Sequence, residues 1–343
     1  MSEGKLLITG GAGFIGSNLA AYHLRRGSAV TIYDNLSRSG TADNLAWLKS
    51  LDGDRLEVVI ADIRDFDRLR AAVAGARVVY HLAAQVAVTT SVTDPRLDFE
   101  VNCLGTFNVV EAVRQAASHP VLVYSSTNKV YGGMEQVAVV KQGQRYGYRD
   151  YPQGISEESP LDFHSPYGCS KGAGDQYVRD YARIYDLQAV VFRQSCIYGP
   201  RQFGNEDQGW VAHFIISAVL GRPLTIYGDG CQVRDVLHVD DLVAAFEAAV
   251  GRIDKAAGQV YNTGGGADNT MSLLELLAHL ETKLGRKIEV AYDRWRSGDQ
   301  KVYVSDVTKL KRDLGWKPQV SAAQGIDHLY AWVIANRKMF EAR

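Results

Sequence analysis

The sequence predicts an α/β fold: a doubly wound parallel sheet followed by a smaller C-terminal α/β lobe. Short apolar runs alternate with amphipathic segments through the first half of the chain. The runs are continuous rather than alternating, which is typical of strands covered on both faces. A glycine-rich turn joins the first run to the first amphipathic segment, as in βαβ units. The length of 343 residues leaves room for the second lobe.

Six buried strands are expected, with helical segments between them. The runs are Lys5–Thr9, Ala29–Tyr33, Leu56–Ile60, Val78–Leu82, Val121–Tyr124 and Ala189–Phe192. In the first helical segment Ile15, Leu19 and Tyr22 recur with helical spacing, and Gly27 marks its end. From Tyr131 to about Ser165 the periodicity fails, and glycines and prolines indicate a long irregular connection.

The second half of the chain mixes short strands with helices, including Ser272–Leu284 and Ala322–Arg337. We expect residues 1–192 to form the sheet domain. The segment from about 235 to 262 is expected to return to this domain. Residues 193–234 and 263–343 then form the smaller lobe. The two domains therefore interleave along the chain.

Composition excludes several classes of partner. The 38 Lys and Arg residues nearly balance 39 Asp and Glu residues, so no global field favours nucleic acid or an anionic membrane. Four cysteines lie far apart and eight histidines show no metal-ligand spacing, which predicts a reduced, cytoplasmic protein without metal. Neither a signal peptide nor an apolar stretch long enough to span a membrane is evident.

The glycine turn predicts a dinucleotide site. Gly10, Gly13 and Gly16 follow the first strand and open the first helix, where they allow a tight turn, close approach of a pyrophosphate and close packing of helix on strand. Asp34 ends the second strand, 18 residues after Gly16, where its carboxylate can accept hydrogen bonds from ribose hydroxyls and repel a 2′-phosphate. This favours NAD over NADP, although Arg38 nearby could accommodate a 2′-phosphate. The domain is thus of the Rossmann type.

A tyrosine and a lysine are the candidate catalytic pair. Tyr167 and Lys171 stand four residues apart at the start of a helical stretch, so they share one face. An ammonium group beside a phenol is expected to lower the pKa of the phenol and make it a base near neutral pH. The polar end of the fifth strand, Ser125-Ser126-Thr127, precedes this helix.

The order of these motifs resembles the extended short-chain dehydrogenase/reductase family, which contains nucleotide-sugar epimerases and dehydratases. The resemblance spans nearly the whole chain through the strings His81-Leu82-Ala83-Ala84, Tyr198-Gly199-Pro200, Arg234-Asp235-Val236-Leu237-His238 and Leu314-Gly315-Trp316-Lys317-Pro318. It implies that Tyr167 moves the hydroxyl proton of the substrate, Lys171 tunes it and holds the nicotinamide ribose, and Thr127 orients the reacting oxygen. It also implies a tightly bound NAD that is not consumed.

The full set of candidate cofactor-binding residues combines the turn, the strand ends and this resemblance. Asp62 and Ile63, after the third strand, are candidates for the adenine, although Asp62 serves equally well as a helix cap. The set is Gly10, Gly13, Phe14, Ile15, Gly16, Asp34, Asn35, Ser37, Arg38, Asp62, Ile63, Leu82, Ala83, Ala84, Asn102, Ser125, Tyr167 and Lys171.

Two positions separate the members of the family. Its dehydratases carry Asp-Glu directly after the catalytic Thr, whereas this chain has Asn128 and Lys129, so dehydration is disfavoured. Longer strings, such as Asn35-Leu36-Ser37-Arg38 and Asp207-Gln208-Gly209-Trp210, resemble the epimerases that invert C2 of a CDP-linked hexose through a 2-keto sugar. The alternatives are a C4 epimerase acting on a UDP- or dTDP-sugar, or an NAD-binding regulatory protein without turnover.

The candidate substrate residues follow from the same resemblance. Arg234 and Arg296 are expected to anchor the diphosphate, because guanidinium groups match phosphate oxygens. Asp299 would orient Arg296 or contact ribose, and Cys196 stands where many relatives have Asn. The remaining candidates are Gln85, Thr89, Ser126, His164, Arg201, Gln202 and Tyr227, of which His164 is as readily structural. Helices Asp94–Ala117 and Tyr167–Tyr185 resemble those that pair subunits in the family, which implies a homo-oligomer, either a dimer or a dimer of dimers.

Overall fold

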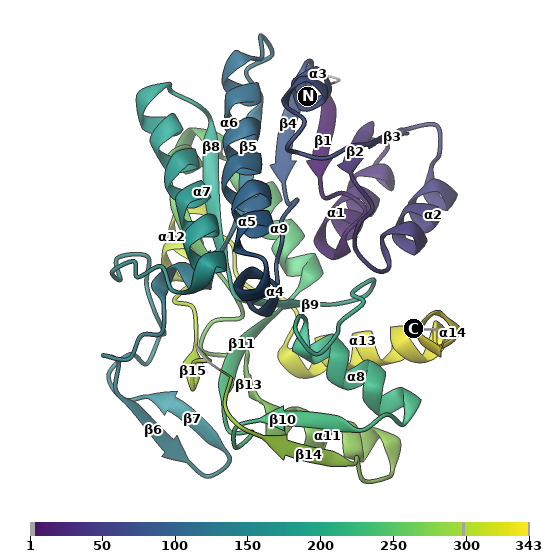
Figure 1. Cartoon of the computed structure of the whole chain (residues 1–343), viewed down its shortest axis with the longest axis vertical. Coiled ribbons are helices and arrows are strands. Elements are labelled where there is room, and N and C mark those ends of the chain that lie inside the picture. Colours follow the sequence, from purple (N-terminus) through teal and green to yellow (C-terminus); the bar gives the residue numbers. More distant parts are fainter. Residues whose placement is uncertain (1–3, 297–298, 342–343) are drawn as a thin grey trace.

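The computed structural model describes residues 4–296 and 299–341; Met1–Glu3, on which the signal-peptide prediction partly rests, lie outside them. The predicted fold class is confirmed. Seven parallel strands form the main sheet in the order β12-β8-β5-β4-β1-β2-β3 (Figure 1). They are β1 Lys5–Thr9, β2 Val30–Asp34, β3 Leu56–Ile60, β4 Ala76–His81, β5 Val121–Thr127, β8 Ala189–Gln194 and β12 Val260–Thr263.

Helices cover both faces of this sheet, which explains why its strands are continuously apolar. One face packs on α1 (Phe14–Leu24), α2 (Thr41–Leu51), α9 (Val239–Gly251) and α12 (Thr308–Leu314), with α10 (Ile253–Ala256) beside them. The other face packs on α3 (Phe66–Val73), α6 (Gly105–Gln115) and α7 (Ser165–Ile184). The carboxyl ends of the strands point toward the second lobe (Figure 1).

The smaller lobe has its own sheets and core. Strand β11 (Val233–His238) pairs with β9 (Cys196–Tyr198), β13 (Thr270–Ser272) and β15 (Val302–Tyr303). Strands β10 (Leu224–Tyr227) and β14 (Val290–Asp293) form a second, parallel pair. Helices α8 (Trp210–Leu220), α11 (Leu273–Leu284), α13 (Ala322–Ala335) and α14 (Lys338–Glu341) enclose these strands.

The chain passes between the lobes more than once. Strand β12 pairs with β8 in the main sheet, and α9 packs against that sheet. The residues Asp235–His238, expected to rejoin the sheet domain, instead lie in β11 of the smaller lobe. The return to the main sheet therefore begins at Val239.

The connection expected to be irregular contains a hairpin, so that expectation is wrong in part. Strands β6 (Val139–Gln142) and β7 (Arg145–Tyr148) pair in antiparallel register, and Gly143 supplies the positive φ of 59° that the turn requires. Val139, Tyr146 and Tyr148 pack on the edge of the smaller lobe. Each strand has only four residues, too few for a clear alternation in the sequence.

The expected helix Asp94–Ala117 runs from Pro95 to Gln115 with one irregularity. Helix α5 (Pro95–Phe99) continues through a π-helical segment η1 (Glu100–Leu104) into α6, after a short α4 (Val88–Thr93). π-helical segments often occur at functional sites. Among the residues that the structure describes, no helix is long and apolar enough to cross a membrane.

Candidate active site

The glycine turn has the geometry that a dinucleotide pyrophosphate requires. Gly10 adopts a φ of 70°, and a Cβ atom on it would lie 2.7 Å from the Ala83 nitrogen. A Cβ atom on Gly16 would collide with the Gly10 carbonyl oxygen. Gly13 is the N-cap of α1 and offers no capping side chain, so the first N–H groups of the helix can meet an anion.

The end of β2 lies beside this turn. The Asp34 carboxylate accepts hydrogen bonds from the Ala12 nitrogen at 3.0 Å and the Leu36 nitrogen at 2.8 Å. Burial raises its pKa, and these bonds oppose that change. The candidate adenosine residues gather here: Asn35 donates to Asp62 at 3.0 Å and accepts from the Ser37 nitrogen.

Two candidates at this end make contacts that the sequence did not predict. The Ile63 side chain is buried against Gly105 of α6, so it belongs to the core. Arg38 donates to Gln208 of the smaller lobe at 2.5 Å and thus bridges the two lobes at the cleft. Asp62 is held by Arg64, which lowers the pKa of that carboxyl to about 2.

The loop after β4 is fixed by buried polar groups. The Thr9 hydroxyl accepts from the Leu82 and Ala83 nitrogens at 3.2 and 3.3 Å, and it contacts His81 Nδ1 at 2.8 Å. Thr106 meets the other ring nitrogen of His81 at 3.0 Å. The loop is thereby held against the glycine turn.

Asn102 and Gln85 hold the same loop rather than face the cleft. Asn102 Oδ1 accepts from the Gln85 nitrogen, and its Nδ2 donates to the Gln85 carbonyl and to Asp98. The Gln85 amide in turn bonds to Ala87 and Asp98. The side-chain amides of Gln85 and Asn102 are thus bonded within the protein, and Gln85 does not line the cavity. Asn102 reaches these partners from the π-helical segment η1.

The catalytic candidates do meet, at the ends of β5 and the start of α7. The Lys171 ammonium donates to the Ser125 carbonyl at 2.6 Å and lies 4.4 Å from the centre of the Tyr124 ring. Burial lowers the pKa of Lys171 to about 7. The Thr127 hydroxyl donates to Asn128 Oδ1 at 3.4 Å, and Thr127 and Tyr167 line one cavity.

The expected lowering of the Tyr167 pKa is not observed. Burial is the largest influence and raises the pKa to about 12. The neighbouring Thr127 hydroxyl and the charge of Arg38 act in the opposite direction, while Asp98 raises the pKa further. Desolvation of the phenolate therefore outweighs the lowering effect of Thr127 and Arg38 on the pKa of Tyr167.

A buried ion pair behind the catalytic residues was not anticipated from the sequence. Asp175 follows Lys171 by one helical turn and accepts two hydrogen bonds from Arg193, each 2.9 Å long. Ser126, a predicted sugar contact, donates to the same carboxylate at 2.7 Å. The sequence could have indicated Asp175, because it lies four residues after Lys171 and therefore on the same helix face.

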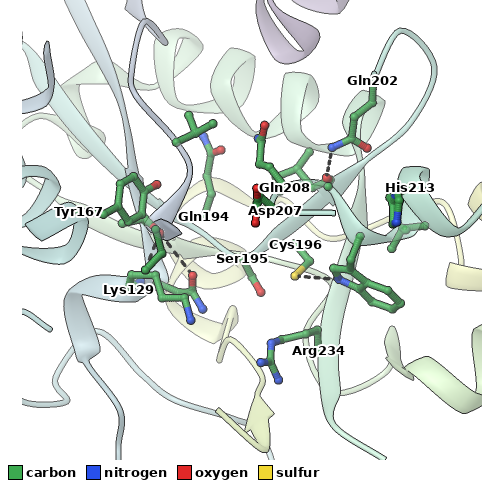
Figure 2. Close-up of a pocket in the computed structure, with 18 of the residues that line it drawn as sticks. Lys129, Tyr167, Gln194, Ser195, Cys196, Gln202, Asp207, Gln208, His213 and Arg234 are labelled. Atoms are coloured by element: carbon green, nitrogen blue, oxygen red, sulfur yellow. Dashed lines mark hydrogen bonds between the residues drawn. The ribbon is translucent and has the colours of Figure 1, made fainter. Parts of the chain in front are cut away.

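A cavity of about 440 Å³ runs between the two lobes (Figure 2). Its volume is in the range of small-molecule sites. It brings together many of the predicted residues: Phe14, Ile15, Leu82, Ala84, Thr89, Ser125, Ser126, Thr127, Tyr167, Lys171, Gln202, Tyr227, Arg234, Arg296 and Asp299. Lys129 and Cys196 line it as well, and the Cys196 sulfur accepts from the Trp210 indole at 3.4 Å.

Arginines and carboxylates face each other at the far end of the cavity. Arg234 donates to Asp299 at 2.8 Å, so Asp299 orients Arg234 rather than Arg296. Arg296 lies 3.9 Å from the centre of the Tyr227 ring and pairs with Glu206 and Asp207. Arg234 and Arg296 are thus each paired with carboxylates.

Two substrate candidates lie elsewhere. His164 is exposed at the N-cap of α7 and does not line the cavity. Arg201 stacks on Trp47 at 4.2 Å and on Trp332 at 5.7 Å, and so joins α2 to α13. Sequence position alone does not reveal such side-chain directions. Gln202, by contrast, lines the cavity and donates to the Ile197 carbonyl at 3.2 Å.

The donor groups of the site fit a dinucleotide and a second anionic ligand. The uncapped α1 terminus suits a pyrophosphate, the Asp34 carboxylate suits ribose hydroxyls, and Lys171 stands where both ligands would meet. Within residues 4–296 and 299–341, no group of three or more His, Cys, Asp or Glu side chains could hold a metal ion.

Comparisons with known proteins agree with this geometry. The model of a family described as GDP-mannose 4,6 dehydratase matches residues 7–329. The chain is 47% identical to CDP-paratose 2-epimerase of Salmonella typhi, over 96% of this chain and 98% of that protein. It is 38% identical to UDP-glucose 4-epimerase of Mycolicibacterium smegmatis, over 94% of this chain and 96% of that protein.

A solved structure of a nucleotide-sugar epimerase is also similar to this chain. UDP-glucuronic acid 4-epimerase of Bacillus cereus, in complex with UDP-glucuronic acid and NAD, superposes with a TM-score of 0.83 at 28% identity. The superposition covers 97% of this chain and 99% of that one. The likeness therefore extends over both lobes.

Proposed function

The chain belongs to the GDP-mannose 4,6-dehydratase family of extended short-chain dehydrogenases/reductases, and from this premise we propose that it inverts C2 of a CDP-linked hexose. The conversion of CDP-paratose to CDP-tyvelose is the type of reaction meant, with CDP-glucose as a further candidate substrate. The supporting observation is that Thr127, Tyr167 and Lys171 meet at one wall of the cavity, with Arg234 among its other lining residues.

The cofactor proposed is NAD, tightly held and not consumed. When bound at the α1 terminus, NAD would supply an acceptor for hydride from the sugar carbon and a donor for its return to the opposite face. The uncapped terminus of α1 and the Asp34 carboxylate support this choice. The NAD in the Bacillus cereus relative supports it as well.

The residues of this chain supply the proton chemistry and the binding. Because burial raises the pKa of Tyr167 to about 12, the proposed reaction requires that the bound ligands lower it. The phenolate then accepts the proton of the C2 hydroxyl as the C2–H bond yields hydride, and a C2 ketone results. In the reverse half, Tyr167 returns the proton to the ketone oxygen as hydride adds to C2. Thr127 holds the reacting oxygen, and Lys171 keeps positive charge beside it. Arg234 and Arg296 anchor the diphosphate while the sugar turns.

Dehydration is disfavoured by the same cavity. Loss of water needs an acid and a base, and the side chains after Thr127 are an amide and an ammonium group, Asn128 and Lys129. A second candidate is C4 epimerisation of a UDP- or dTDP-sugar, which the Mycolicibacterium smegmatis relative favours. The proton chemistry would be the same.

Turnover of three sugar nucleotides tests the proposal. Purified protein is incubated with CDP-paratose, CDP-glucose and UDP-glucose, and the released sugars are identified by NMR. Inversion at C2 of a CDP-sugar is expected. Galactose from UDP-glucose, without C2 inversion of either CDP-sugar, would overturn the proposal in favour of the C4 epimerase.

We also propose a homo-oligomer located in the cytoplasm. Exposed apolar side chains on the segment from α4 to α7 support self-association: Val92, Phe99, Leu104, Tyr177, Ile184 and Tyr185. The four cysteines are free, and Cys169 is exposed, which suits a reducing compartment. Light scattering of the purified protein would give the oligomeric state.

A further inference from the structure

Lys129 lies next to the catalytic residues but has no place in the chemistry described so far. It belongs to the short 3₁₀ segment η2 (Asn128–Tyr131) that follows β5. Its backbone nitrogen donates to the Thr127 hydroxyl at 3.2 Å, which fixes the start of its side chain. Lys129 and Tyr167 are neighbours at one wall of the cavity, and Arg234 lies across from them (Figure 2).

The surroundings of Lys129 are cationic. Within the described residues, its ammonium group has neither a salt bridge nor a hydrogen bond, and the Asp299 carboxylate offsets its charge only from beyond bonding distance. The nearby Asp299 carboxylate already accepts a hydrogen bond from Arg234. Burial is the main cause that lowers the pKa of Lys129, and Arg234 adds to it. Two cations thus share one carboxylate, an arrangement that an anionic ligand would stabilise.

The position of the charge distinguishes between carbons of the sugar. In a sugar nucleotide the diphosphate is attached at C1, which is bonded directly to C2, whereas C4 lies across the ring. When Thr127 and Tyr167 hold the C2 hydroxyl, the sugar-linked phosphate must lie close to them. A cation two residues beyond Thr127 suits that position. When C4 reacts, the ring separates the phosphate from the catalytic pair.

We propose that Lys129 binds the phosphate attached to the sugar and thereby presents C2, rather than C4, to Thr127 and Tyr167. This inference rests on the proposed function, because it assumes a nucleotide diphosphate sugar as substrate. Lys129 is then a residue that determines which carbon reacts. A carboxylate at this position would repel the phosphate.

Binding of CDP and CMP tests the inference without requiring turnover. CDP carries the second phosphate and CMP lacks it. We expect Lys129→Met to weaken CDP binding roughly 10- to 100-fold, the range for a lost hydrogen bond to a charged group, and to leave CMP binding unchanged. Titration calorimetry of the holoenzyme measures both. Lys141→Met is the matched control, since Lys141 is exposed on the hairpin and pairs with Asp229.

The outcomes separate this inference from the proposed function. Unchanged CDP binding, or equal weakening of CDP and CMP, would overturn the role of Lys129. If the wild-type protein does not invert C2 but Lys129→Met still loses CDP binding selectively, the proposed function is overturned and the phosphate contact of Lys129 stands. With an active wild type, KM for the CDP-sugar should rise 10- to 100-fold in Lys129→Met. Should that variant not fold, Lys129→Gln removes the same charge with a polar side chain.

Discussion

Arg193 of β8 and Asp175 of α7 are joined by two parallel hydrogen bonds, each 2.9 Å long. Both side chains are at least 98% buried. Since Asp175 also receives the Ser126 hydroxyl, the pair ties the catalytic helix to the strand that carries Thr127. Its role is therefore to position the residues that act on substrate.

We expect Asp175→Asn to be strongly destabilising. It leaves the Arg193 charge buried without its anion, which costs about 3–5 kcal/mol in the free energy of unfolding. Asp180→Asn is the control on the same helix, where an exposed pair with Arg183 contributes less than about 1 kcal/mol. Urea unfolding gives the free energy of unfolding of both variants. Similar losses of stability in Asp175→Asn and Asp180→Asn would contradict the positioning role.

Cofactor choice is expected to depend on Asp34. Replacement by Asn removes the negative charge that repels a 2′-phosphate, while an amide oxygen remains to accept the Ala12 or Leu36 nitrogen. We expect the affinity ratio of NADP to NAD to rise at least roughly tenfold in Asp34→Asn. Fluorescence titration with each dinucleotide measures the ratio. The exposed Asp54→Asn should leave it unchanged, and an unchanged ratio in Asp34→Asn would refute the assignment.

We expect His81 to make the fold sensitive to acid. The Thr9 hydroxyl accepts two backbone N–H groups, so its own proton points to His81 Nδ1, which must stay unprotonated. Burial lowers the pKa of His81 from 6.5 to about 3. The unfolded chain therefore takes up a proton between these values, and stability falls as the pH falls from about 6.5 toward 3.

The expected slope from this group is about 1.4 kcal/mol per pH unit in the free energy of unfolding. Urea unfolding from pH 7 to pH 5 should thus show a shallower loss in His81→Asn than in the wild type. Asn is chosen because it offers an acceptor to Thr9 without a titrating group. Parallel pH profiles in the two proteins would disprove the assignment.

Tyr167→Phe should abolish turnover while the cofactor stays bound. Without the phenolic oxygen no group accepts the C2 hydroxyl proton, so kcat should fall roughly 10²- to 10⁴-fold. The NAD released on denaturation measures cofactor content. Tyr177→Phe, on an exposed position of the same helix, should retain full activity. A wild-type protein that binds NAD and turns over none of the sugar nucleotides would instead support the regulatory alternative.

Much of the fold follows from local patterns. Six strands are continuous apolar runs because both faces of the sheet are covered, and these runs were recognisable. The hairpin of β6 and β7 was missed because four-residue strands show too little alternation of polar and apolar residues. Asp235–His238 were assigned to the wrong sheet because the sequence of one strand does not specify which strand it pairs with.

The site was predictable where backbone geometry governs it. The glycine turn, Asp34 and the spacing of Tyr167 and Lys171 follow from the chain itself. Side-chain direction does not follow from the sequence. Gln85 and Arg201, expected at the sugar, make other contacts, and His164 is exposed outside the cavity. The charges around Asp175 and Lys129 are brought together only by folding, so the sequence did not reveal them.

One measurement tests the central claim most directly: NMR analysis of the sugar formed from CDP-paratose or CDP-glucose in D₂O. Direct return of hydride to C2 predicts the C2-inverted sugar with protium retained at C2. Deuterium at C2, or the absence of any C2-inverted product, would contradict the proposed reaction.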